Sequence, residues 1–205
     1  KREMDQYRGK APHPWIEAIG FGNLIPFEHQ DLNAWTDSLH FATSSNKYNS
    51  VHEETNILFG GGIDDMFLDI HTGKCHLVDF KSTANITNNE RPIPLEGQWK
   101  QAYKRQMDMY YWIGKRKGLP ISKDCYFFYV DGQNLGVNGM GVDPVTGIAQ
   151  LTFETSFIHY EANDDWVDST LKRIKQTLHL PQCPEHSESC EHGRFLRMVD
   201  DLQKK

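Results

Sequence analysis

The residues best placed to do chemistry lie in the run GGGIDDMFLDIHTGKCHLVDFKST, which spans positions 60–83. Asp79 and Lys81 are one residue apart in a β-prone segment, so their side chains project from the same face of a strand. A short turn containing Gly73 separates this segment from the preceding β-prone run. The pattern predicts a β-hairpin that carries acidic residues on both strands.

The length of the hairpin turn decides which aspartate joins Asp79. With a two-residue or four-residue turn centred on Thr72–Gly73, Asp64 lies opposite Lys81 and shares its face, because directly opposed residues point the same way. A three-residue turn would bring Asp65 to that face instead. We expect Asp64 at the site and keep Asp65 as the alternative metal ligand.

Two carboxylates on one face repel each other by roughly 4 kcal/mol at a separation of about 4 Å and an effective dielectric near 20. Lys81 relieves part of this repulsion, and a divalent cation would relieve more. Two carboxylates, a backbone carbonyl and water suit Mg²⁺ or Mn²⁺ better than Zn²⁺. The alternative is a solvated salt bridge at a strand edge. The rest of the face is apolar, which makes unpaired charges unfavourable there; it carries Met66, Leu68, Cys75 and Leu77.

The segments GGIDD and LVDFKST, followed by QMDMY at 106–110, together resemble the RecB-type branch of the PD-(D/E)XK nuclease superfamily. Ile63 stands where the family name has proline. The resemblance implies an α/β fold with a central mixed β-sheet flanked by helices and a restriction-endonuclease-like core. It also implies a Mg²⁺- or Mn²⁺-dependent deoxyribonuclease that hydrolyses phosphodiester bonds. The alternative function is a catalytically inactive module of this fold that binds nucleic acid or a partner protein.

The resemblance also implies a role for each residue of the hairpin motif. Asp64, Asp79 and the backbone carbonyl of Phe80 would hold the metal ion. Lys81 would orient the attacking water or stabilise the phosphate in the transition state.

A predicted helix and an upstream segment would complete the site. Gln106 and Tyr110 are one turn apart, and the resemblance implies that they contact the active site or the nucleic-acid strand. Packing of the tyrosine into the core is the alternative. The family often has a further upstream ligand, for which His52, Glu53 and Glu54 are three open candidates.

Contacts with DNA are predicted at two places. Ser82 and Thr83 follow the catalytic lysine and could donate hydrogen bonds to phosphates. Lys100, Lys104 and Arg105 give the predicted helix a basic face among aromatic residues, a combination that suits phosphates and stacked bases.

The C-terminal segment contains four potential metal ligands within ten positions: Cys183, His186, Cys190 and His192. They form a candidate structural zinc site, although their spacing is not a standard one. Some RecB-type nucleases hold an iron–sulfur cluster with four cysteines, three of them near the C-terminus. Two cysteines in this segment argue against an intact cluster.

Composition and patterning bound the remaining expectations. The 205 residues carry a formal net charge of -6, so DNA binding would need a local basic patch or bound metal ions. We expect an N-terminal leader and helix at 1–50, a nuclease core at 51–180 and a Cys/His tail at 181–205. Because no apolar run reaches the length of a membrane span and no signal peptide is recognisable, we expect an intracellular, cytoplasmic protein without membrane contact.

Overall fold

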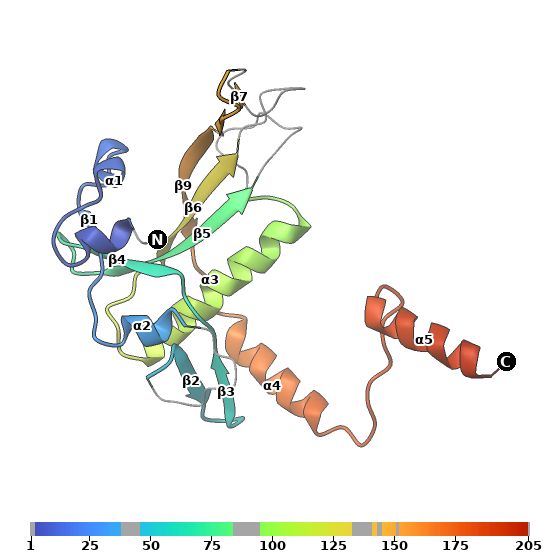
Figure 1. The fold of residues 1–205 in the computed structure, drawn as a ribbon. Helices are drawn as coiled ribbons and strands as arrows, with labels where there is room; N and C mark the ends of the chain where they lie inside the picture. The colour runs from blue at the N-terminus through green and yellow to red at the C-terminus, as the bar shows by residue number, and fades with distance from the viewer. Residues whose placement is uncertain are drawn as a thin grey trace.

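The computed structural model describes residues 3–37, 46–83, 95–132, 141–142, 145–150 and 152–204. Among these residues, a five-stranded sheet has the strand order β1, β4, β5, β6, β9 (Figure 1). Within it, β5 and β6 are parallel and the other neighbouring pairs are antiparallel. The strands are β1 (Leu24–Pro26), β4 (Asp65–Asp69), β5 (Cys75–Thr83), β6 (Asp124–Gly132) and β9 (Phe153–Glu161).

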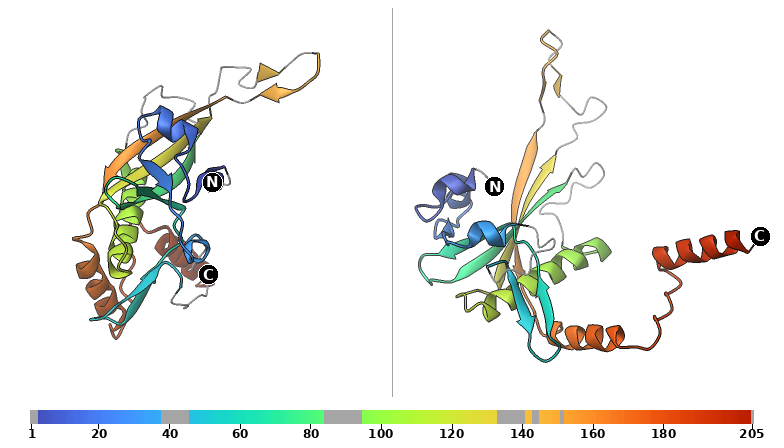
Figure 2. Two further views of the ribbon diagram at one scale, coloured as in Figure 1. Left: turned by 90° about the vertical axis from the view of Figure 1, so that its left-hand side faces the viewer. Right: turned by 60° about the horizontal axis from the view of Figure 1, so that its bottom comes forward.

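Helices cover both faces of this sheet. The helix α3 (Gln98–Arg116) crosses one face, whereas η1 (Met4–Tyr7) and α1 (Pro14–Ala18) lie on the other, as the right-hand view of Figure 2 shows. Each face has its own apolar cluster. The prediction of an α/β fold with a mixed sheet flanked by helices is therefore confirmed.

The alternation of side chains along β4 and β5 divides these two clusters. Met66 and Leu77 belong to the cluster under α3, whereas Phe67 and Val78 belong to the cluster under the N-terminal helices. Asp79 follows Leu77 by two residues and therefore faces α3. The apolar pattern of the hairpin thus fixes the side of the sheet on which its charged residues lie.

The register of the hairpin differs from the predicted one by two residues. Asp65 pairs with Val78 and Met66 with Leu77, which brings Asp64 level with Asp79 instead of Lys81. A four-residue turn, 70–73, joins β4 to β5, because the Asp69 N–H donates to the carbonyl of Lys74 over 2.8 Å. A four-residue turn keeps the predicted parity, so the shared face of Asp64 and Asp79 is as expected although the opposed pairs are not.

The first predicted strand of the hairpin is two separate strands. β3 (Ile57–Gly60) pairs with β2 (Asn49–His52) in a small second sheet, and the chain then leaves strand geometry before β4 begins. Three consecutive glycines at 60–62 lie at this break. Because of this break, Asp64 lies in a connecting segment just before β4 and not within a strand.

The predicted N-terminal leader is part of the fold. β1 adds an edge strand to the central sheet, and Met4, Ile16 and Leu24 are buried in the cluster on the far side from α3. A further helix of the segment 1–50, where the sequence predicts a leader and a helix, is α2 (Leu32–Trp35). Residues 38–45 lie outside the described part of the chain.

The helix predicted to carry Gln106 and Tyr110 is present as α3. α3 ends next to Gly118, whose positive φ of 73° suits a residue that follows a helix. α4 (Val167–Leu178) packs Val167 and Leu171 against the α3 cluster. Two minor strands, β7 (Gly141–Val142) and β8 (Ala149–Gln150), pair with each other.

A further helix, α5 (Glu191–Gln203), lies in the segment predicted as a tail. It stands away from the sheet in Figure 1 and in the right-hand view of Figure 2, and Phe195, Met198 and Leu202 are exposed. Among the described residues, no helix combines the length and the apolarity that crossing a membrane requires.

Candidate active site

Asp64, Asp79 and Lys81 converge on the face of the sheet that α3 covers. The Lys81 ammonium lies 2.5 Å from Oδ2 of Asp79, and the Asp79 side chain is almost fully buried. Asp64 accepts a 2.8 Å hydrogen bond at Oδ2 from the backbone N–H of Phe80, the residue between the other two. The backbone of β5 thereby holds the carboxylate of Asp64 beside that of Asp79.

The electrostatics of this cluster are unfavourable to the charged form of Asp79. Burial is the main reason that its pKa rises from 3.8 to about 6; the Lys81 ammonium opposes this rise, and the neighbouring Asp64 carboxylate adds to it. Oδ2 of Asp79 receives no hydrogen bond of regular geometry from the described residues, although Lys81 is close. A buried carboxyl whose pKa is raised and which lies beside a second carboxylate is a candidate functional group.

Gln106 and Tyr110 act on the segment that carries Asp64. The Tyr110 hydroxyl donates to the carbonyl of Gly62 over 2.6 Å and accepts a 2.9 Å hydrogen bond from Nε2 of Gln106. A Cβ added at Gly61 would lie 2.8 Å from the Tyr110 ring, so only glycine leaves room for this approach. The helix motif and the glycine motif therefore meet, and their contact fixes the backbone two residues before Asp64.

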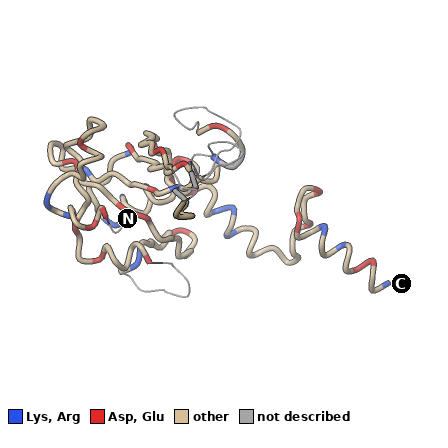
Figure 3. The backbone as a smooth tube through the Cα atoms, turned by 45° about the horizontal axis from the view of Figure 1, so that its top comes forward, with Lys and Arg blue, Asp and Glu red and all other residues tan. Residues whose placement is uncertain are grey.

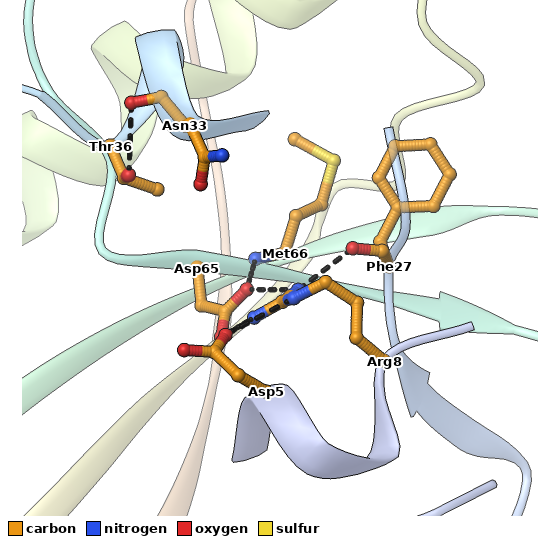
Figure 4. Close-up of polar contacts among 7 residues, drawn as sticks. All are labelled: Asp5, Arg8, Phe27, Asn33, Thr36, Asp65 and Met66. Atoms are coloured by element: carbon orange, nitrogen blue, oxygen red, sulfur yellow. Dashed lines mark hydrogen bonds and ion pairs between the residues drawn. The ribbon is translucent and has the colours of Figure 1, made fainter. Parts of the chain in front are cut away.

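Asp65 lies outside this cluster. Asp65 projects to the opposite face, where its two carboxylate oxygens each lie 3.0 Å from a guanidinium nitrogen of Arg8 (Figure 4). Its Oδ1 also accepts the backbone N–H of Met66, and Arg8 donates to the carbonyl of Phe27. Asp65 is fully buried and its oxygens are occupied, so the alternative metal ligand is not supported.

The three residues around Lys81 are distributed over both faces. Phe80 packs its ring edge-on against Phe128 on the far face. Ser82 shares that face by strand alternation and is exposed, whereas Thr83 shares the face of Lys81. Of the two predicted phosphate donors, only Thr83 is on the side of the cluster.

The upstream ligand candidates have partners elsewhere. His52 is buried, with Nδ1 2.8 Å from the Thr55 hydroxyl and Nε2 3.4 Å from Asp168. Glu54 forms a 2.6 Å ion pair with Lys172, and Glu53 is exposed in the same turn. The described contacts give none of the three a place beside Asp79.

Lys100 reaches the cluster from the first turn of α3. Its ammonium donates to the Tyr129 hydroxyl over 2.8 Å, and burial, followed by the charge of Lys81, lowers its pKa. The ammonium of Lys81 lies 4.5 Å from the centre of the Tyr103 ring, and that of Lys100 lies 5.6 Å from the same centre. Tyr103 and Tyr129 were not predicted as site residues. The parallel pairing of Tyr129 with Lys81 could have revealed its position, but that register is not readable from sequence.

The two other predicted basic contacts lie on a different flank of α3. Lys104 and Arg105 line a surface hollow together with Gln101, Asp108 and Trp166. Figure 3 shows acidic and basic residues interspersed along the described chain, without a large continuous basic stretch. The structure therefore brings Lys100 to the acidic cluster but not Lys104 or Arg105.

The candidate zinc residues are brought together only in part. Cys190 precedes α5 and its Sγ lies 3.4 Å from Nδ1 of His186. The same sulfur accepts the backbone N–H of Gly193 and so caps the helix. Cys183 and His192 are exposed. Within the described ranges, no group of three or more metal-ligating side chains is assembled.

The oxygen donors of the cluster suit a hard divalent cation that takes few of its ligands from the protein. Asp64 and Asp79 supply carboxylate oxygens on one face, and Mg²⁺ or Mn²⁺ commonly keeps several waters beside one or two carboxylates. The specific observation in favour of this fit is that the carboxylates of Asp64 and Asp79 are neighbours, with the Lys81 ammonium paired to Asp79.

Comparison of the chain with protein-family models, with curated proteins and with solved structures finds no match. The geometry of the site therefore carries the functional argument.

Proposed function

We propose that this protein is a Mg²⁺- or Mn²⁺-dependent deoxyribonuclease with a restriction-endonuclease-like core. The observation that supports this most is the convergence of Asp64, Asp79 and Lys81 on one face of the central sheet, where two neighbouring carboxylates meet one ammonium. The resemblance of the three sequence motifs to RecB-type nucleases points to the same residues.

The reaction would be hydrolysis of a phosphodiester. A water oxygen forms a bond to phosphorus while the bond from phosphorus to one sugar oxygen breaks; the water loses a proton and the leaving oxygen gains one. Asp64 and Asp79 would hold the metal ion, with the carbonyl of Phe80. When bound, the ion would lower the pKa of a water and neutralise charge on the phosphate.

The chain's own groups contribute orientation and charge. Lys81 lies against Asp79 and presents its ammonium beside the carboxylate pair, where it would stabilise negative charge that develops on the phosphate. Gln106 and Tyr110 are positioning residues, because their hydrogen bonds hold the carbonyl of Gly62 and thereby the segment that delivers Asp64.

The test is cleavage of end-labelled single-stranded and double-stranded DNA in Mg²⁺, Mn²⁺ or EDTA. We expect metal-dependent cutting by the wild type and a loss of at least about 100-fold in Lys81→Ala, the usual scale for removing one group that stabilises transition-state charge. Lys74→Ala is the matched control, because Lys74 is exposed next to the turn of the same hairpin, away from the cluster. A wild type that binds DNA without cutting it would support the inactive binding module instead.

A further inference from the structure

The ammonium of Lys100 differs from that of Lys115, on the same helix, in the groups that contact it. The nearest partners of its ammonium are the Tyr129 hydroxyl at 2.8 Å and the faces of two tyrosine rings, with centres 4.5 Å away for Tyr129 and 5.6 Å for Tyr103. Among the described residues, it forms no ion pair with a carboxylate. All its contacts are neutral groups.

Lys115, on the same helix, provides the contrast. Its ammonium also lies over a tyrosine ring, 4.8 Å from the centre of Tyr111, but it forms a 2.6 Å ion pair with Asp164. Lys115 therefore has its counter-charge within the protein. Lys100 has the aromatic support without the counter-charge.

The location of Lys100 is also electrostatically unfavourable. It lies in the first turn of a 19-residue helix, the end at which a helix disfavours cations, and no acidic residue shares that turn. Lys81, a second cation, contacts the same Tyr103 ring. Folding alone gives no reason to place two ammonium groups around one ring when only Lys81 has an acidic partner.

We infer that Lys100, Tyr129 and Tyr103 form an anion subsite beside the Asp79–Lys81 pair, and that its ligand is a phosphate group of the bound DNA strand. This inference rests on the proposed function, because it assigns a second phosphate contact within that active site. Tyr129 orients the ammonium by accepting its hydrogen bond. The two rings restrict the ammonium to the side of the cluster where Lys81 lies.

The phosphate can come from two sources, an internal phosphodiester or a 5′-terminal phosphate. The first carries one negative charge and the second carries close to two at neutral pH. Both chemistries suit an ammonium with no internal counter-ion, so the experiment compares DNA with each kind of end.

The test is the affinity of fluorescent single-stranded DNA, with a 5′-phosphate or a 5′-hydroxyl, measured by anisotropy in EDTA. The proteins are wild type, Lys100→Met, Lys100→Arg and the matched control Lys115→Met. We expect Lys100→Met to weaken binding about 3- to 10-fold and to reduce the slope of log affinity against log salt by about 0.7, the value for one lost phosphate contact on single strands. Lys100→Arg should retain most of the affinity.

The pattern across the two DNAs identifies the ligand. An equal loss for both supports an internal phosphodiester, and a loss confined to the 5′-phosphorylated DNA supports a terminal phosphate. Equal binding by wild type and Lys100→Met, or an equal loss in Lys115→Met, would overturn the subsite.

Cleavage assays of the same four proteins separate this inference from the proposed function. If the wild type cuts DNA and Lys100→Met leaves both affinity and KM unchanged, only the subsite is wrong. If the wild type neither binds nor cuts DNA, the proposed function fails and the subsite fails with it.

Discussion

Asp64 and Asp65 are neighbours in the chain, yet their environments are opposite. Asp65 is fully buried and meets the guanidinium of Arg8 with both oxygens (Figure 4). Asp64 is half-buried and lies beside a second carboxylate, that of Asp79, whose pKa burial raises to about 6. One aspartate is satisfied by the protein itself. The other belongs to a pair of neighbouring carboxylates, and a raised pKa in such a pair is typical of a functional site.

The largest contrast should appear in catalysis. Asp64→Asn keeps the shape of the side chain but removes one of the two carboxylates that would hold the metal ion, so we expect DNA cleavage to fall about 100- to 1000-fold. Its free energy of unfolding in EDTA should not fall, because the substitution also removes repulsion from Asp79. Cleavage assays and urea unfolding of the same preparation measure both. A cleavage loss larger in Asp65→Asn than in Asp64→Asn, at equal folded fraction, would reverse the assignment.

The converse contrast should appear in stability. Asp65→Asn leaves the Arg8 guanidinium with only the exposed carboxylate of Asp5 as a counter-charge. The free energy of unfolding should therefore fall by up to about 3 kcal/mol, the lower end of the range for breaking a buried ion pair. Urea unfolding in EDTA measures the loss. Replacing both partners with apolar residues, as in Arg8→Met with Asp65→Leu, should recover most of it. If stability is not recovered, the Arg8–Asp65 pair stabilises the fold by more than the mutual neutralisation of its charges.

Asp79 should also make metal-free stability depend on pH. Its pKa is 3.8 in the unfolded chain and about 6 in the folded protein, so the folded state binds more protons between these values. The free energy of unfolding should therefore fall as pH rises from 4 to 7, by an amount on the order of 2 kcal/mol that is missing in Asp79→Asn. The measurement is the difference between the two unfolding curves in EDTA across this range. Curves that stay parallel would show that folding does not raise the pKa of Asp79.

The smallest effect concerns the contact between the glycine and helix motifs. Tyr110→Phe removes the hydroxyl that holds the carbonyl of Gly62, which should lower stability by about 1 kcal/mol and cleavage by about tenfold through misplacement of Asp64. Gly61→Ala should act in the same direction, because its Cβ would approach the Tyr110 ring. If the loss in Tyr110→Phe is entirely in KM for DNA, the tyrosine contacts the strand instead.

The hairpin also separates the features that local sequence patterns predict from those that they do not. The alternation of apolar and charged residues in the hairpin was sufficient to predict that Asp64, Asp79 and Lys81 share a face, because strand periodicity is local. The exact register was not, since it depends on a turn that begins at Ile70 rather than at His71. The pairing of Arg8 with Asp65 joins positions 57 residues apart, and no local pattern encodes it.

The same limit applies to the positions of α3 residues. Helical spacing predicted that Gln106 and Tyr110 lie one turn apart on one face of α3, and they share a hydrogen bond. It could not predict that their partner is a carbonyl of the glycine segment, or that Lys100 rather than Lys104 or Arg105 reaches the acidic cluster. Those outcomes depend on how the whole helix is rotated over the sheet, which packing of its apolar residues decides.

The opposite orientations of Asp64 and Asp65 bear on how this region can vary through descent. A one-residue insertion or deletion in the turn 70–73 would shift β4 against β5 and reverse both side chains at once, removing the Arg8 anchor together with the acidic cluster. A point substitution can remove the role of Asp64 and leave that of Asp65, or the reverse. In any lineage of this protein, the length of this turn should therefore persist longer than the identity of Asp64.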